Sequence, residues 1–302
     1  MRRKFWGSDS FFQGCVNVIL FLFMCIELYP LLYVLSCSLS NPEAVSGGKV
    51  ILFPIGFNLG GFEKILKYKD IWIGYGNTIL YTFVGTVISL LVTLTCAYTL
   101  SRIDVVGRKV LTVYFMITMY LSGGMIPGYL NVKSLGLVDT RTYIFIYGAL
   151  SVYNLLVART FFANSIPVAL TEAARIEGCN DIRVFTRIVI PLSKPLITVM
   201  TLYYAVPRWN SYFTEMIYLK SRSKYPLQSF LKEILLETKM AETAASTVGM
   251  SSAEVKYYQE IAKQAELMKY CVIIVATVPM LLVYPKLQKY FEKGIMLGSV
   301  KE

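Results

Sequence analysis

The amino-acid sequence predicts an all-α integral membrane protein with six transmembrane helices. Of its 302 residues, 55% are hydrophobic and only 16% are charged, and the mean hydropathy is +0.54. Soluble domains are rarely this apolar. Apolar runs of the length that crosses a bilayer, about 20 residues each, cover approximately residues 13–37, 77–100, 110–126, 142–163, 196–219 and 268–290. We therefore expect a single transmembrane domain over residues 1–302.

Local signals mark the ends of several of these runs. The run at 13–37 follows a basic N-terminus and is too long for the apolar region of a signal peptide, so we expect it to be retained. The run at 110–126 is interrupted at its end by Gly123, Gly124 and Pro127, all of which favour turns. Polar helices and Pro/Gly-punctuated stretches are expected in the loops between the runs.

The distribution of basic residues orients the predicted helices. Six spans place both termini on one side, together with the basic loop at 102–109 and the segment 164–195. The two faces carry nearly equal numbers of Lys and Arg, but the opposite face holds two long loops, which count less in setting orientation. We therefore expect both termini to be cytoplasmic.

Composition excludes several chemistries. The chain contains no His, which removes His-based acid–base catalysis, Ser-His-Asp triads and His metal sites. The six Cys are scattered without a CxxC spacing and are interpreted as small apolar packing residues. The net charge of +11 is attributed to cationic loops that lie against anionic lipid headgroups. No GxxxxGK[ST] sequence is present, so ATP hydrolysis is not expected in this chain.

A charged segment interrupts the apolar runs between the fourth and the fifth. Residues 171–195 read TEAARIEGCNDIRVFTRIVIPLSKP, a helix–glycine–helix pattern. Ser165 is expected to cap the first short helix, and Asn180 the second. Gly178 is expected to end the first helix in the left-handed conformation.

This segment has the features of a rigid docking element for a soluble partner. Ala173 and Ala174 are expected to keep its exposed turn narrow, and Glu172 places a carboxylate beside them. The alternative is a pair of amphipathic helices that lie on the membrane surface.

The segment resembles the EAA loop of ABC-importer permeases, in which a Glu-Ala-Ala triplet precedes a glycine, an isoleucine and a Leu-Pro pair. The matching residues are Glu172, Ala173, Ala174, Gly178, Ile188 and Pro191. The chain departs mildly from that pattern at Glu177, Cys179 and Ile190. Further phrases are similar to the carbohydrate branch, and within it to the MalG-like, LplC-type permeases of oligosaccharide importers: 76–86, 122–140, 209–213, 225–231 and 294–301.

The resemblance implies the type I ABC-importer permease fold in a bacterial cell membrane. It implies four kinds of partner: a homologous second permease, two ATPase subunits that bind ATP and Mg, an extracytoplasmic solute-binding protein and an oligosaccharide. The residues that it assigns to ATPase coupling, within the cytoplasmic coupling loop 164–195, are Glu172, Ala173, Ala174, Gly178, Phe185 and Pro191. The tail at 294–301 is expected to add ATPase contacts.

The fifth run carries polar side chains among aromatic ones. Ionisable groups inside a span usually face a cavity or a partner, and aromatic faces with polar neighbours suit sugar rings. The candidate substrate-pathway residues are Tyr203, Tyr204, Arg208, Trp209, Asn210 and Glu215. The alternative is that they make structural contacts with the second permease. Arg208 and Glu215 are expected on one helix face, and Arg208 gains a role as counter-charge if the sugar is acidic.

Three other functions remain open from the residues alone. A polytopic membrane enzyme would need clustered carboxylates or metal ligands near a span end. A stand-alone transporter would normally show internal repeats or broken helices and would not need the docking segment. A permease of a peptide or amino-acid importer is the nearest alternative, and the phrases SGGMIPGYL and WNSYF favour sugar through the resemblance only.

Overall fold

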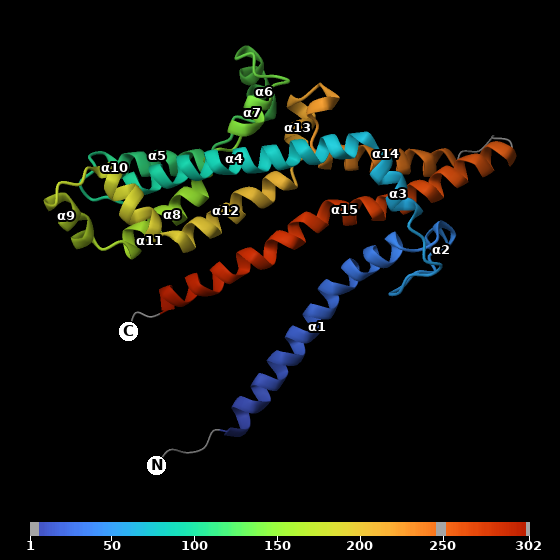
Figure 1. The fold of residues 1–302 in the computed structure, drawn as a ribbon, viewed down its shortest axis with the longest axis horizontal. Coiled ribbons are helices and arrows are strands. Elements are labelled where there is room, and N and C mark those ends of the chain that lie inside the picture. The colour runs from blue at the N-terminus through green and yellow to red at the C-terminus, as the bar shows by residue number, and fades with distance from the viewer. Residues whose placement is uncertain (1–5, 246–251, 300–302) are drawn as a thin grey trace. The chain divides into compact units, whose positions relative to one another are not determined.

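The computed structural model describes the backbone of residues 6–245 and 252–299, and these residues form helices and connections without a strand. The chain divides into two compact units. The first comprises Met1–Lys69 and Leu231–Val278, and the second comprises Asp70–Phe230 and Pro279–Glu302. Figure 1 shows the helices of both.

The first unit is built on α1, which runs from Trp6 to Ser38, together with α2 (Pro42–Ser46) and α3 (Gly60–Lys67). It also contains most of α14 (Leu227–Ala245) and the first part of α15 (Ser252–Ser299). Cys271 packs against Gly61, and its thiol donates to the carbonyl oxygen of Ser38 over 3.3 Å. Cys37 and Cys271 are fully buried, in agreement with their predicted role as small packing residues.

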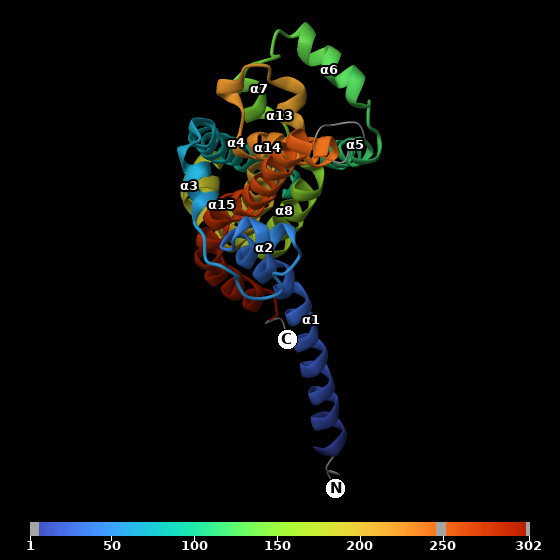
Figure 2. The same ribbon diagram turned by 90° about the vertical axis from the view of Figure 1, so that its right-hand side faces the viewer.

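The second unit contains the segments that concern function. Its elements are α4 (Lys69–Ser101), α5 (Arg108–Tyr120), α6 (Met125–Ser134), α7 (Arg141–Ile146), α8 (Val152–Ser165), α9 (Val168–Ile176), α10 (Asp181–Val184), the π-helical turn η1 (Phe185–Val189), α11 (Ile190–Leu192), α12 (Lys194–Trp209), α13 (Phe213–Tyr218) and the 3₁₀ turn η2 (Arg222–Lys224). Helices α4, α5, α8 and α12 run together in one bundle, and α9 to α11 form one end of it (Figure 1). Figure 2 looks toward the other end, where α4, α5 and α8 are labelled.

The structure confirms the all-helical class but not six uninterrupted spans. Three helical segments in the described residues are long and apolar enough to cross a membrane: Ser10–Ser38, Lys69–Ser101 and Glu260–Leu282. Two pairs of consecutive helices, each bent at a short break, raise the number of candidate spans to five if each pair counts as one span. The first pair joins Arg108–Tyr120 to Met125–Ser134 at 114°, and the second joins Asp181–Leu192 to Lys194–Trp209 at 83°.

The runs at 142–163 and 196–219 are each broken into two helices. In the first, Gly148 has a φ of 63° and separates α7 from α8, whose N-terminus is capped by the Ser151 side chain. In the second, α12 ends at Trp209 and α13 begins at Phe213. Apolar composition continues through the first break and could not reveal it, whereas the polar pair Asn210 and Ser211 marks the second.

An aspartate joins two connections of the second unit. Asp139 has a φ of 59°, a conformation that Asp adopts more readily than most residues. Its carboxylate accepts hydrogen bonds from the backbone N–H groups of Lys220 and Ser221, at 3.0 Å each. The Ser221 hydroxyl and the Lys224 ammonium, at 2.9 Å, also contact it. The hydrogen bonds, first that from the Ser221 hydroxyl, hold the pKa of this carboxyl well below its usual range.

Helix α12 packs closely against α4 at Gly85. A Cβ atom at Gly85 would lie 2.3 Å from Nη1 and 2.6 Å from Cζ of Arg208. The Arg208 guanidinium therefore rests on the backbone of α4, and no larger residue fits there without displacing it.

Asp139→Asn is expected to destabilise the protein at pH 7 by about 1.5–3 kcal/mol, the range for hydrogen bonds to a charged group. Asn tolerates the same φ but lacks the charge. Because the folded-state pKa of Asp139 is depressed, its stabilisation is present above about pH 4 and is lost as the pH falls below that value. The measurement is the thermal midpoint of the purified protein at pH 7 and pH 3, with Glu177→Gln as control; equal midpoints for wild type and Asp139→Asn at pH 7 would contradict it.

Gly85→Ala is expected to displace the Arg208 guanidinium and to destabilise the protein by about 1–3 kcal/mol through unsatisfied hydrogen-bonding groups. Gly76→Ala is the matched control, because Gly76 lies on the same helix and a Cβ there meets nothing within 4 Å. The control should be neutral or gain up to about 1 kcal/mol, because Gly is unfavourable inside helices. The measurement is again the thermal midpoint, and identical midpoints for the two variants would refute the close contact.

Candidate functional site

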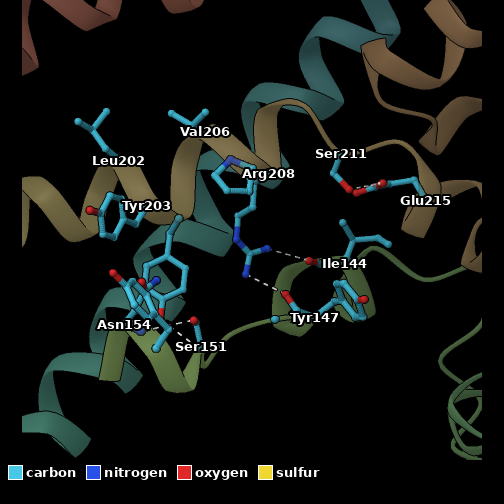
Figure 3. Close-up of a pocket in the computed structure, with 14 residues that line it drawn as sticks. Ile144, Tyr147, Ser151, Asn154, Leu202, Tyr203, Val206, Arg208, Ser211 and Glu215 are labelled. Carbon is cyan, nitrogen blue, oxygen red and sulfur yellow. Dashed lines mark hydrogen bonds between the residues drawn. The ribbon is translucent and has the colours of Figure 1, made fainter. Parts of the chain in front are cut away.

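A cavity of about 700 Å³ opens in the second unit (Figure 3). Its walls come from α7 and the break that follows it, from α8, from α12 and from α13. The lining is mostly apolar and aromatic with a few polar groups, which is the usual composition of small-molecule sites. The lining residues are Ile144, Tyr147, Gly148, Ser151, Tyr153, Asn154, Leu202, Tyr203, Tyr204, Val206, Pro207, Arg208, Ser211 and Glu215.

Arg208 is the cation of this cavity. Its Nη1 donates to the carbonyl oxygen of Ile144 over 3.2 Å, and its Nη2 donates to the carbonyl oxygen of Tyr147 over 2.9 Å (Figure 3). Nη2 also donates to the Ser89 hydroxyl over 3.0 Å. These acceptors are neutral, so they orient the guanidinium without compensating its charge. Among the described residues no ion pair reaches Arg208, and the carboxylate that acts on it electrostatically is that of Glu215 in the same cavity.

Glu215 lies in the same cavity but on a different helix from Arg208. It is 5% exposed, and its carboxylate accepts a hydrogen bond from the Ser211 hydroxyl over 2.8 Å. The expectation that the two residues share one helix face is wrong, because the chain is not helical between Trp209 and Phe213. The turn between α12 and α13 nevertheless brings both side chains to the cavity.

Two tyrosines of α12 that were predicted to line the substrate pathway, Tyr203 and Tyr204, also line the cavity. The Tyr204 hydroxyl lies 2.6 Å from Thr93 Oγ1 and accepts a hydrogen bond from the Ser151 backbone N–H over 3.2 Å. Tyr203 is half exposed and lines the cavity, and a tyrosine ring is a side chain on which sugar rings stack.

The structure places four of the six sequence-predicted pathway residues at the cavity: Tyr203, Tyr204, Arg208 and Glu215. Trp209 and Asn210 are not among the lining residues. Trp209 is buried and its ring lies 6.5 Å from that of Tyr75, and the Asn210 amide donates to the carbonyl oxygen of Val206 at the end of α12.

Sequence reasoning missed the wall between α7 and α8. Tyr147, Ser151 and Asn154 line the cavity because the helix breaks at Gly148. The signals that could have identified the break are this glycine and the serine three residues later, whose side chain accepts from the Asn154 backbone N–H.

A second site lies at the other end of the bundle, on the segment predicted to dock a partner. We call residues 164–195 the docking loop. Gly178 has a φ of 82° and follows the end of α9, and the Asn180 side chain caps α10 by accepting from the Arg183 N–H over 2.9 Å. Both predictions are confirmed. The cap predicted at Ser165 is wrong, because α8 runs through Ser165 and Pro167 precedes α9 without a side-chain cap.

The docking loop has one exposed face and one buried face. Glu172 and Ala173 are exposed, and Ile176 is 87% exposed and Ile182 is 73% exposed. Ala174 is buried at 6% exposure, which corrects the expectation that it forms part of the exposed turn. It packs in a cluster with Val184, Val189 and residues of α4, α8 and α12.

The other two predicted coupling residues anchor the loop. The ring of Phe185 lies 5.1 Å from that of Tyr98 on α4. Pro191 lies in α11 beside the 83° bend, where the buried Ser193 hydroxyl donates to the carbonyl oxygen of Val189 over 2.7 Å. The exposed apolar turn is therefore carried on a rigid base. Within the described residues, no cluster of three or more His, Cys, Asp or Glu is placed to hold a metal ion.

Known proteins with similar sequences and structures identify the family. No protein-family model matches the chain. It is 39% identical to the polygalacturonan/rhamnogalacturonan transport system permease protein YtcP of Bacillus subtilis (strain 168), covering 97% of this chain and 99% of that protein. It is 37% identical to protein LplC of the same organism, covering 91% and 90%.

A solved structure indicates the same family. A bacterial ABC transporter involved in the import of the acidic polysaccharide alginate contains a chain that matches with a TM-score of 0.82 and 34% identity. The match covers 96% of this chain and 100% of that one. Together with its apolar helices, these similarities show that the chain belongs to the membrane permeases of sugar ABC transport systems, which are transport components rather than enzymes.

Proposed function

We propose that the chain is a permease subunit of an ATP-driven importer of oligosaccharides and forms half of its translocation pathway. The observation that carries this proposal is that one helix, α12, joins the two sites. It begins at the bend that ends the docking loop and ends at Arg208 and Trp209 beside the cavity. Movement of the loop would therefore move one wall of the cavity.

The docking loop couples the chain to an ATPase. Its exposed apolar residues and the free carboxylate of Glu172 form a narrow projection suited to a groove on a soluble partner. Its buried face packs into the bundle, so a displacement imposed by the partner is transmitted as a rigid-body movement rather than absorbed by bending. ATP and Mg are bound by that partner.

The proposed assembly contains this chain, a homologous second permease, two ATPase subunits and an extracytoplasmic solute-binding protein. Both termini and the docking loop lie in the cytoplasm of a bacterium, on the side where the ATPases work. The exposed apolar surface of α1 is covered by lipid or by the second permease. YtcP, which is named as a transport-system permease, and the chain of the alginate ABC transporter support this assembly.

The substrate class that fits the cavity best is an acidic oligosaccharide. Arg208 presents a fixed positive charge whose hydrogen-bond acceptors are all neutral, and a charge inside a membrane protein is best compensated by an opposite one. The alginate importer, described as importing an acidic polysaccharide, supports this choice. A neutral oligosaccharide is the second candidate, because other relatives are named for arabinooligosaccharides and for melibiose, raffinose and stachyose.

Co-purification from the native membrane tests the assembly. The tagged wild-type chain is expected to recover a second permease and an ATPase in stoichiometric amounts. Glu172→Arg is expected to lose the ATPase and keep the second permease, because the substitution reverses the charge on the exposed projection. Glu177→Arg, an equal charge change at an exposed position beside Gly178, is the matched control. Recovery of the wild-type chain alone, or an ATPase indifferent to both changes, would argue against the proposal.

Arg208→Gln tests the substrate class in an uptake assay that compares a galacturonate oligomer with a neutral oligosaccharide of equal length. Gln keeps a hydrogen-bond donor and removes the charge. We expect uptake of the galacturonate oligomer to fall about tenfold or more, the effect of losing one charge-assisted contact, with neutral uptake little changed. Arg208→Lys should retain part of the activity. Equal loss for both sugars would mean that Arg208 acts only in packing against Gly85.

A further inference from the structure

Four charged side chains form a closed ring at the base of the docking loop. Arg102 pairs with Asp104 and, through Nη1, with Asp181 over 2.7 Å. Arg175 completes the ring by pairing with Asp104 and with Asp181, over 3.0 Å in each case. Each carboxylate thus contacts both guanidinium groups, and each guanidinium contacts both carboxylates.

The ring is better placed to hold a geometry than a single surface ion pair. An isolated exposed pair contributes little, but a network with fixed planar groups contributes more. Arg102 is its least exposed member, with 18% of its side chain accessible, and its guanidinium carbon lies 5.8 Å from the centre of the Tyr98 ring. The hydrogen bond from Arg102 holds the pKa of the Asp104 carboxyl below its usual range, so the ring stays charged at neutral pH.

The four residues come from three separate segments. Arg102 and Asp104 lie in the connection that follows α4, Arg175 lies in the last turn of α9, and Asp181 begins α10. The ring therefore ties both sides of the turn at Gly178 to the end of α4. Arg102, Asp104 and Arg175 also line a groove of about 520 Å³ together with Glu172.

Helix α4 leads from this ring to the cavity. Its Gly85 carries the Arg208 guanidinium, and its Ser89 accepts a hydrogen bond from it. The docking loop is thus connected to Arg208 twice, once through the bend into α12 and once through the ring and α4. A loop held at only one of these points would be free to pivot about it.

We propose that the ring of Arg102, Asp104, Arg175 and Asp181 is a positioning device that fixes the orientation of the docking loop on α4. Its consequence, which rests on the proposed function, is that binding-protein-stimulated ATP hydrolysis requires the ring whereas basal hydrolysis does not. Asp181 and Arg102 act through the orientation of the loop and not by contact with the substrate.

The orientation is measured directly with two spin labels in the purified full-length chain without its ATPase, so that a label on the exposed projection does not compete with the partner. Val106 and Ile176, which are 95% and 87% exposed, are the labelling positions, in a background whose thiol-reactive native cysteines are replaced by alanine. The wild-type ring should produce one narrow distance distribution. Asp181→Asn should broaden it, and Asp181→Glu, which keeps the charge, should restore most of the narrow component.

The same variants are assayed for ATP hydrolysis with and without the purified solute-binding protein and a galacturonate oligomer. Asp181→Asn is expected to reduce the stimulated rate about fivefold or more, the lower range of measured coupling between sites, and to leave the basal rate and the co-purifying subunits unchanged. Arg183→Gln is the matched control, because it removes one charge from the same loop and leaves the four ion pairs in place.

These results test the positioning role of the ring separately from the proposed function of the chain. An unchanged distance distribution in Asp181→Asn would overturn the positioning role. Loss of both basal and stimulated hydrolysis, with dissociation of the complex, would also overturn it, because that result indicates that the ring only stabilises the fold. A broadened distribution with full stimulation would overturn the coupling consequence. A wild-type complex without an ATPase would refute the proposed function, while the distance measurement on the chain would still decide whether the ring positions the loop.

Discussion

One half-buried cation, Arg208, links three helices of the second unit. The Arg208 guanidinium must be solvated by the protein inside an apolar bundle, and it takes its acceptors from the Ile144 and Tyr147 carbonyls and the Ser89 hydroxyl. This requirement determines how closely α12 approaches α4, since only glycine at position 85 leaves room for the planar group. The break at Gly148 ends α7 at Ile146, so carbonyl groups at this end of the helix are available to accept from Arg208.

The helix breaks are part of the same arrangement. Backbone groups released inside a membrane must find partners, so irregular backbone at that depth is tolerated where it is buried in protein or lines a cavity. The break between α7 and α8 lines the cavity, and its polar groups find partners: the Ser151 N–H donates to Tyr204, and the Ser151 side chain caps α8. The break between α12 and α13 places Ser211 and Glu215 in hydrogen-bonding distance. The interruptions of the runs at 142–163 and 196–219 are thus the two that build the cavity.

The docking loop shows how a polar segment becomes rigid. Its exposed face carries the features that a partner would contact, and its buried face carries Ala174, Val184 and Val189 into the same cluster as α4, α8 and α12. The contact between the Phe185 and Tyr98 rings holds one side of the loop, and the ring of Arg102, Asp104, Arg175 and Asp181 holds the other. This packing on the bundle, rather than the similarity to permeases of sugar transport systems, is the reason for proposing that the loop transmits force instead of lying on a membrane.

The sequence by itself determined the helical class, the apolar runs, the turn at Gly178, the cap at Asn180 and the family resemblance of the docking loop. These features depend on composition and on the conformational preferences of residues close together in the chain. The tertiary structure alone decided that Ala174 is buried, that Arg208 rests on Gly85, that Tyr147 and Asn154 line the cavity while Trp209 does not, and that Arg102 meets Asp181. Those outcomes arise from contacts between segments far apart in the chain, where space and unsatisfied polar groups, rather than local propensity, select the arrangement.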